Sequence, residues 1–440
     1  MKQNESQPTF REIMMEFARK TGLSPASSAP RRYLWTDAFA VCNFLGLYQE
    51  TWSEEFKDLA LKLVDQVHDT LGRHRKEDSR TGWISGLGEE DGRLHPTKGG
   101  LRIGKELQER GSNDPFNESL EWDRDGQYYH YLTKWMHALN RASRVTGDIK
   151  YNTWAMELAK TAHASFVYAP SYGGPKRMYW KMSIDLSLPL VPSMGQHDPL
   201  DGFVTYNELQ ATAAKDPKKS THSTPRSRAR GMPFDKLKVP STAEGLRVDT
   251  ERRFLPRFKN RGLAPSNVSM GNDLRAEIFD MANICEGKIW ATDDPLGIGG
   301  LLFDACRVAQ LMVSGNLEQT GLLETLLESS LIGLNSFVKE NSLKLPAGYR
   351  LAFRELGLSI GLRAVEKIRE LIEQKSRLLP KKDSLHSLLK TLSRYAGLRE
   401  TIEKFWLEGT NREADSWIGH HDINWVMLAT SLAPDGFLEL

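Results

Sequence analysis

Acidic residues stand at or near the starts of several apolar segments of this chain, often beside aromatic residues. Two carboxyl groups that face one bond can cleave a glycosidic linkage: one protonates the leaving oxygen, and the other acts as base or nucleophile. Their separation, about 5–5.5 Å or about 6.5–9.5 Å, decides between retention and inversion. The candidate catalytic acids are Asp123, Asp125, Asp198, Asp201 and Asp294.

Asp123 and Asp125 are the preferred proton donors, because Trp122 and Tyr128 stand close to them in the sequence. Aromatic neighbours can exclude water from a carboxyl group, which raises its pKa, and can stack on a sugar ring. The partner carboxyl group would be that of Asp198, Asp201 or Asp294. The first and last of these three precede a proline, where an Asp more often caps a helix than takes part in catalysis.

A polar stripe begins at the same place in the chain. Asp123, Gln127, His130, Lys134 and His137 follow at spacings of four, three, four and three residues, which places them on one face of a helix. The other faces are apolar and aromatic. We therefore predict a helix over residues 122–146 whose stripe lines a wet cavity; the alternative is an ordinary helix with a stripe facing solvent.

Further polar and aromatic residues near expected helix starts could bind a substrate. His420, His421 and Asp422 lack a third metal ligand at helical spacing, so we expect hydrogen bonding there and no metal site. Arg350 could pair with a buried carboxylate or hold a uronate by two hydrogen bonds. The substrate-binding candidates are Trp35, Asp37, Trp122, Gln127, His130, His197, Arg350, His420, His421 and Asp422.

Helices of two kinds would position these residues. Apolar segments are found at 35–48, 122–146, 296–313, 347–372 and 417–432, and one more is expected after His197. Amphipathic segments alternate with them at 54–73, 151–167, 322–338 and 385–406. The stretch 176–191 instead alternates every second residue, which predicts one long strand or the edge of a hairpin.

Two of the apolar helices share an Asp-Pro-Leu start, at 198–200 and 294–296, and such a recurrence indicates a repeated unit. Alternating apolar and amphipathic helices are typical of a two-layer ring in which the inner helices run parallel and their first residues gather at one rim. The helix dipoles would favour carboxylates at that rim. The predicted fold class is all-α: an (α/α)6 toroid of six helical hairpins with long loop insertions, which leaves room for a small β-hairpin.

This alternation of helices, with aromatic and acidic residues at the helix starts, resembles the six-hairpin, or (α/α)6-barrel, superfamily from about Tyr33 to Leu432. The resemblance implies a sugar-binding cleft and a glycoside hydrolase-like activity on an oligosaccharide. A sugar epimerase or isomerase is the alternative, with His197 and either His420 or His421 as its two histidines. Asp293 and Asp294 stand where one of those histidines would be sought, which weakens this alternative. A third is a non-catalytic toroid that binds a sugar or a protein.

Composition limits the remaining possibilities. The 440 residues carry a formal net charge of +2, which gives no indication of nucleic-acid binding. The three cysteines are far apart and suggest buried thiols. There is no signal pattern and no uninterrupted apolar stretch of about 18 residues, so we expect a cytoplasmic protein without a membrane span. Gly297, Gly299 and Gly300 follow no strand, so no nucleotide cofactor is predicted.

A single domain is expected over residues 1–440, interrupted by two insertions. The first, at 77–115, is rich in glycine and in charges of both signs. The second, at 215–255, is basic and is expected to be a flexible loop, with contact to a polyanion as the alternative. Nothing in the sequence indicates an oligomeric state.

Overall fold

The computed structural model describes residues 7–111, 114–171, 173–191, 193–214, 273–318, 320–374 and 383–440, and these residues are mostly helical, as the sequence predicts. The predicted basic insertion at 215–255 lies outside the described residues. Six helices form one group, here called the inner helices: α2 (Leu34–Thr51), α6 (Tyr129–Thr146), α8 (Asp198–Ala214), α10 (Pro295–Val313), α12 (Ala352–Gln374) and α16 (His421–Leu432).

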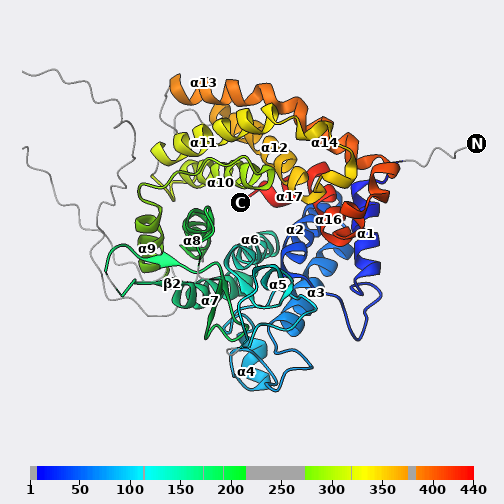
Figure 1. Ribbon diagram of the computed structural model, residues 1–440, viewed down its shortest axis with the longest axis vertical. Helices are drawn as coiled ribbons and strands as arrows, with labels where there is room; N and C mark the ends of the chain where they lie inside the picture. Colours follow the sequence, from blue (N-terminus) through cyan, green and yellow to red (C-terminus); the bar gives the residue numbers. More distant parts are fainter. Residues whose placement is uncertain are drawn as a thin grey trace, which may run out of the picture.

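Each inner helix packs against two others. In order, α2 contacts α6, α6 contacts α8, α8 contacts α10, α10 contacts α12, α12 contacts α16, and α16 returns to α2. Figure 1 shows these helices around the middle of the molecule, where the C-terminus also lies. Each also packs on one helix of a second group, α3 (Glu54–Leu71), α7 (Ile149–Phe166), α9 (Arg275–Cys285), α11 (Thr320–Lys339), α14 (Ala396–Leu407) or α1 (Phe10–Lys20). Helix α13 (Asp383–Leu392) lies against α11.

Helix α10 shows how the sequence sets up an inner helix. Asp294 caps it by accepting a hydrogen bond from the Gly297 amide at 2.9 Å, and Pro295 occupies the first turn, where no amide proton is needed. A Cβ at Gly299 would collide with the backbone of Gly357, so these glycines let α10 and α12 pack closely. By length and composition α10 could cross a membrane, but 72% of it is buried inside the protein, as in a core helix.

The expected helix over 122–146 is divided. A short helix, α5 (Glu118–Asp123), ends before strand β1 (Gln127–Tyr128), and α6 begins only at Tyr129. Gly126 makes the break with φ of +145°, and a Cβ there would lie 2.7 Å from the carbonyl oxygen of Met182. The first two members of the predicted polar stripe are therefore not on the inner helix, whereas His130, Lys134 and His137 are.

The predicted strand over 176–191 is a set of short strands instead of one long strand. Strand β4 (Lys181–Met182) pairs antiparallel with both β1 and β5 (Pro189–Val191), and β2 (Val167–Tyr168) pairs with β3 (Arg177–Met178). The first insertion, which contains α4 (Glu89–Leu94), is held against this hairpin by Arg80, which bonds to Asp185 at 2.9 Å. The small hairpin that the sequence allowed is thus present.

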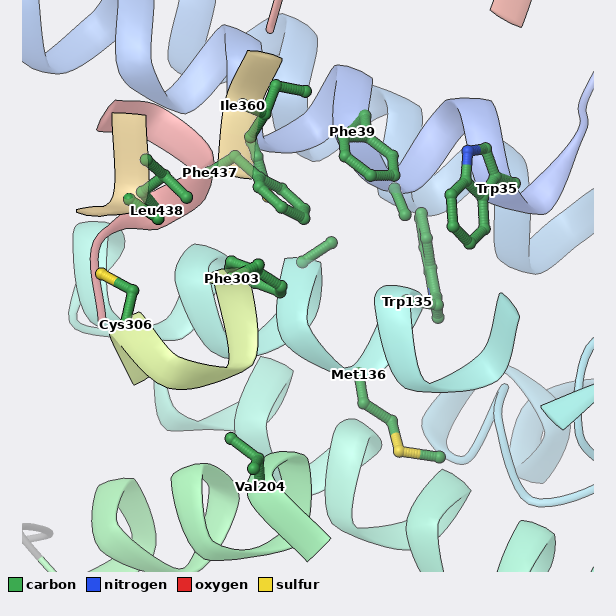
Figure 2. Packing of buried hydrophobic residues seen from close by; sticks show 14 of the residues in the cluster. Trp35, Phe39, Trp135, Met136, Val204, Phe303, Cys306, Ile360, Phe437 and Leu438 are labelled. Atoms are coloured by element: carbon green, nitrogen blue, oxygen red, sulfur yellow. The ribbon is translucent and has the colours of Figure 1, made fainter. Parts of the chain in front are cut away.

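Short elements complete the described chain. They are α15 (Asp415–Ile418), α17 (Asp435–Leu438) and the 3₁₀ turns Ser342–Lys344, Ala347–Tyr349, Ser393–Tyr395 and Gly409–Glu413. Helix α17 lies between inner helices and contacts α2 and α10. Its Phe437 stacks between Phe39 of α2 and Phe303 of α10, with ring centroids 4.3 Å and 4.4 Å away (Figure 2). Cys42, Cys285 and Cys306 are buried free thiols, as the sequence predicts.

Candidate active site

The inner helices enclose a cavity with a volume of about 300 Å³. All six contribute to its lining, and the aromatic ring of Phe437 from α17 lines it as well. Its size is at the lower end of small-molecule sites, which span about 300–1,000 Å³. The residues of the inner helices that line it come from the first two or three turns of each helix.

Asp198, at the start of α8, is the carboxyl group best suited to proton transfer. It lines the cavity and is 6% exposed, and its Oδ2 has no hydrogen-bond partner among the described residues. Burial, reinforced by the negative charge of Asp201, raises the pKa of Asp198 to about 7. A carboxylic acid that keeps its proton near neutral pH can act as a general acid.

Asp201, one helical turn further along α8, is in the opposite electrostatic state. Burial alone would raise its pKa, but Lys134 and Arg307 outweigh this effect and hold the pKa well below its ordinary value. The Lys134 ammonium lies 2.7 Å from Oδ2 and the Arg307 guanidinium 2.6 Å from Oδ1. The Thr133 hydroxyl donates a further hydrogen bond. Asp201 is therefore a fixed negative charge beside a neutral acid.

A buried ionic network extends beneath this pair. Arg307 also bonds to Asp304 at 2.5 Å and to Glu208 at 3.2 Å, and its side chain is fully buried. Burial raises the pKa of Asp304 to about 6 in spite of this contact. Glu208 in turn contacts Nδ1 of His137 at 3.0 Å, and the other nitrogen of that ring donates to the Phe437 carbonyl. Since buried charges are costly unless paired, the network fixes these side chains in place.

His130 and His197 both line the cavity as neutral imidazoles. Burial lowers the pKa of His130 to about 3, and it also lowers the pKa of His197. The Trp180 indole donates to Nδ1 of His130 at 3.2 Å, so the proton of this ring lies on Nε2. His197 donates from Nε2 to the Trp290 carbonyl at 2.8 Å, which leaves its Nδ1 as an acceptor.

Aromatic rings form part of the cavity wall. Trp35 and Trp180 line it on either side of His130, whose ring centroid lies 5.9 Å and 6.2 Å from theirs. The indole Nε1 of Trp35 is buried and donates no hydrogen bond within the described residues. The cavity wall thus offers aromatic surface beside the polar groups of α6 and α8.

Six of the predicted residues lie in the cavity. They are Trp35, His130, His197, Asp198, Asp201 and Asp294. Asp294 is already saturated, because one oxygen caps α10 and the other pairs with Arg354 at 2.8 Å. It therefore fits the capping interpretation better than a catalytic one.

The preferred proton donors, by contrast, lie outside the cavity. Asp123 is exposed at the end of α5. Asp125 is fully buried and accepts hydrogen bonds from Arg102 at 2.9 Å and from the Gly104 amide at 3.0 Å, so it anchors the first insertion. The Gln127 side chain likewise forms hydrogen bonds with backbone groups. Trp122 is 43% exposed, and its ring makes an edge-to-face contact with Trp180.

The remaining predicted residues also lie elsewhere. Arg350 forms a buried salt bridge with Glu355 at 2.6 Å, in agreement with the prediction that it could pair with a buried carboxylate. His420 is exposed, and His421 bonds to Asp422 at 3.0 Å beside α1. Asp37 is buried against Arg32 at 3.2 Å and lines a separate groove. The described residues contain no group of His, Cys, Asp or Glu side chains that could hold a metal ion.

Sequence reasoning did not select several residues that shape the cavity. Asp304 and Arg307 were detectable, because two charged residues inside the otherwise apolar segment 296–313 must be paired if they are buried. Lys134 belonged to the predicted stripe but was not chosen. Phe303 and Phe437 carried no local signal, since ordinary core residues have the same composition.

Comparisons with known proteins leave the family open. No protein-family model matches the chain, and no curated protein matches it. Among solved structures, the chain is similar to a crystal structure of a sugar epimerase from a ruminal bacterium, with a TM-score of 0.44 and 10% sequence identity over 93% of this chain and 88% of that one. A similarity this low identifies neither the fold nor the activity.

Proposed function

We propose that this protein is a carbohydrate-active enzyme of the glycoside hydrolase type, with Asp198 as its general acid. The observation that carries the proposal is the contrast between Asp198 and Asp201. One carboxyl group keeps its proton to a pKa of about 7 and has a free oxygen, while the other, one turn away, stays ionised. Neighbouring carboxyl groups whose pKa values are driven apart are the pattern expected of an acid and its charged partner.

In this mechanism Asp198 donates its proton to the leaving oxygen. Asp201 supplies negative charge that stabilises the positive charge developing on the sugar ring. Its hydrogen bonds to Lys134 and Arg307 make it a weak base, so we assign it this electrostatic role. Nδ1 of His197 is free to accept a hydrogen bond from an attacking water or a sugar hydroxyl.

The architecture supports a six-hairpin toroid. The contacts between the inner helices form a closed cycle, and each inner helix packs on one helix of the outer group. The aromatic rings and polar side chains that line the cavity suit a sugar, which presents both apolar C–H faces and hydroxyl groups.

The test compares Asp198→Asn with wild type on a panel of glycosides that differ in their leaving group. A 4-nitrophenol leaves without protonation, whereas an alcohol needs the proton. We expect Asp198→Asn to lower kcat on alkyl glycosides by about 100-fold or more, and to affect 4-nitrophenyl glycosides much less. The exposed residue Asp123 gives the control variant, Asp123→Asn, which should retain activity on both. Equal losses on the two leaving groups, or no loss, would remove Asp198 from the role of acid.

Isomerisation or epimerisation of a free sugar is the second candidate, and one observation favours it. His130 and His197 share the cavity as neutral rings, and Nδ1 of His197 remains available as a proton acceptor. His420 and His421 do not line this cavity. Incorporation of deuterium from solvent into a free sugar, lost in His197→Gln, would establish this reaction; hydrolysis without exchange would exclude it.

A further inference from the structure

The cavity is polar on one side only. Helices α6 and α8 contribute His130, Lys134, Asp198 and Asp201 to its lining. Asp304 of α10 belongs to the same side, because its carboxyl group is held by the Arg307 that binds Asp201. A ligand can therefore make its charged and hydrogen-bonded contacts on this side of the cavity.

Helices α12, α16 and α17 offer no such groups. They contribute Gly357, Ile360, Met427 and Phe437 to the lining, all without a polar side chain. Ile360 and Phe437 lie near one another beside the stacked ring of Phe303, as Figure 2 shows. Phe303 is seven residues beyond Leu296, so it lies about 10 Å deeper along α10. At this depth the side of the cavity formed by α12, α16 and α17 is apolar and aromatic, whereas Lys134 and Asp304, both held in ion pairs, line the opposite part.

Gly300 leaves part of this deep space open. It lies in α10 and lines the cavity, and a Cβ built on it would meet no atom within 4 Å. Glycine weakens a helix by about 0.5–1 kcal/mol relative to alanine. Gly299 is needed for close helix packing, but neither close packing nor a left-handed backbone requires glycine at position 300. The absence of a side chain at Gly300 therefore serves to keep space free in the cavity.

A sugar that filled the whole cavity would press hydroxyl groups against these apolar residues. Hydroxyl groups buried without a hydrogen-bond partner are unfavourable. Transfer of an apolar group from water to the same place would be favourable in free energy. The apolar side of the deep end consequently favours the part of the ligand that carries no hydroxyl groups.

We propose that the substrate is a glycoside with an apolar aglycone, an alkyl or aryl group that occupies the space beside Gly300 and Phe437 while its sugar faces Asp198 and His130. This inference rests on the proposed function for the reaction, but it makes a separate statement about binding. In this arrangement the bond between sugar and aglycone lies beside Asp198, at the start of α8.

Matched alkyl glycosides test the inference by equilibrium binding. Isothermal titration calorimetry would compare methyl, butyl and hexyl glycosides of glucose, galactose and mannose, using Asp198→Asn to prevent turnover. Burial of each methylene group should tighten binding about fourfold, so burial of about three of the five added methylene groups would give at least about a 50-fold gain from methyl to hexyl with one of the sugars. Gly300→Leu, which fills the deep space, should abolish that gain.

Gly397 provides the matched control, because it also lies in a helix with open space around its missing Cβ but is exposed on α14. Gly397→Leu should keep the full gain. No tightening with chain length for any sugar, or a gain that survives Gly300→Leu, would overturn the inference. If the hexyl glycoside binds tightly but the wild-type protein does not hydrolyse it, the inference about binding stands and the proposed hydrolase function is wrong. If the protein hydrolyses glycosides but binds them equally well at every chain length, the hydrolase function stands and the inference is wrong.

Discussion

Arg307 and Asp201 form a buried salt bridge of 2.6 Å directly below the cavity. The same guanidinium also binds Asp304 and Glu208, so three carboxyl groups share one arginine. Lys134 adds a second positive charge on Asp201 from the opposite side of the carboxyl group. The position and charge of Asp201 therefore depend on two cations from two different helices.

Loss of the shared arginine should destabilise the protein strongly. Arg307→Met keeps much of the side-chain volume but leaves the buried carboxylates without their cation, and breaking such a pair costs about 3–5 kcal/mol. Urea denaturation would measure the free energy of unfolding. Arg93→Met is the control, because the Arg93 side chain is 60% exposed although it forms ion pairs. Its replacement should lower the free energy of unfolding by less than about 1 kcal/mol. A similar small loss in both variants would contradict a structural role for the network.

Asp198 should make stability fall as the pH rises. Its pKa is about 7 in the folded protein and near 3.8 when unfolded, so between these values the folded state binds the extra proton. The contribution of neutral Asp198 is complete below pH 3.8 and is lost as the pH passes 7, at up to about 1.4 kcal/mol per pH unit.

Asp198→Asn removes this titration, so the comparison isolates it from the other buried acids. Urea denaturation at a series of pH values from 4 to 8 should show wild type losing stability relative to the variant over this range. Parallel curves for the two proteins would mean that Asp198 is ionised in the folded state and has no proton to donate.

The pH dependence of turnover should respond to Asp201. Activity requires protonated Asp198, so kcat/KM should fall above a pH near 7. Asp201→Asn removes a negative neighbour and leaves Lys134 and Arg307 without their partner, and both changes favour ionised Asp198. The fall in activity should therefore shift to lower pH. Asp293→Asn removes an exposed charge near the start of α10 and should leave the profile in place; an equal shift in both variants would show a general charge effect.

Phe437 should be important for stability as well as for the cavity. It is 2% exposed and stacked between two phenylalanines, and truncation of such a ring to alanine costs about 3–5 kcal/mol. Phe437→Ala should also enlarge the deep end and shift the preferred alkyl chain to a greater length. Phe279→Ala, at a ring 53% exposed on α9, should change stability by less than about 0.5 kcal/mol and leave chain-length preference unchanged.

Part of the site could be predicted from the sequence because it depends on local signals. The Asp-Pro pattern at Asp198 and Asp294 predicts the start of a helix. The alternation of apolar and amphipathic helices predicts that those helix starts lie around one cavity. Trp35, His130 and His197 lie near similar starts, which is why they also meet there. Periodicity and capping operate within a few residues, so a single sequence contains them.

The choice of acid depended on contacts that no local pattern contains. Asp125 has aromatic neighbours in sequence, yet Arg102 from the insertion saturates it. Gly126 also ends the preceding segment before α6 begins, so the expected helix could not carry this acid to the rim. The sequence predicts Asp198 as the partner carboxyl group or as a helix cap, not as the proton donor, although one of its oxygens has no hydrogen-bond partner among the described residues. These distinctions depend on long-range packing and on solvation.

The stack of Phe39 on Phe437 joins positions about 400 residues apart in the chain. Contacts within a hairpin can form early in folding, whereas one that spans almost the entire chain must await the closure of a very long loop. The binding cavity is therefore complete only when both ends of the chain have met. A ligand held there would slow the separation of those ends and so prolong the lifetime of the native state.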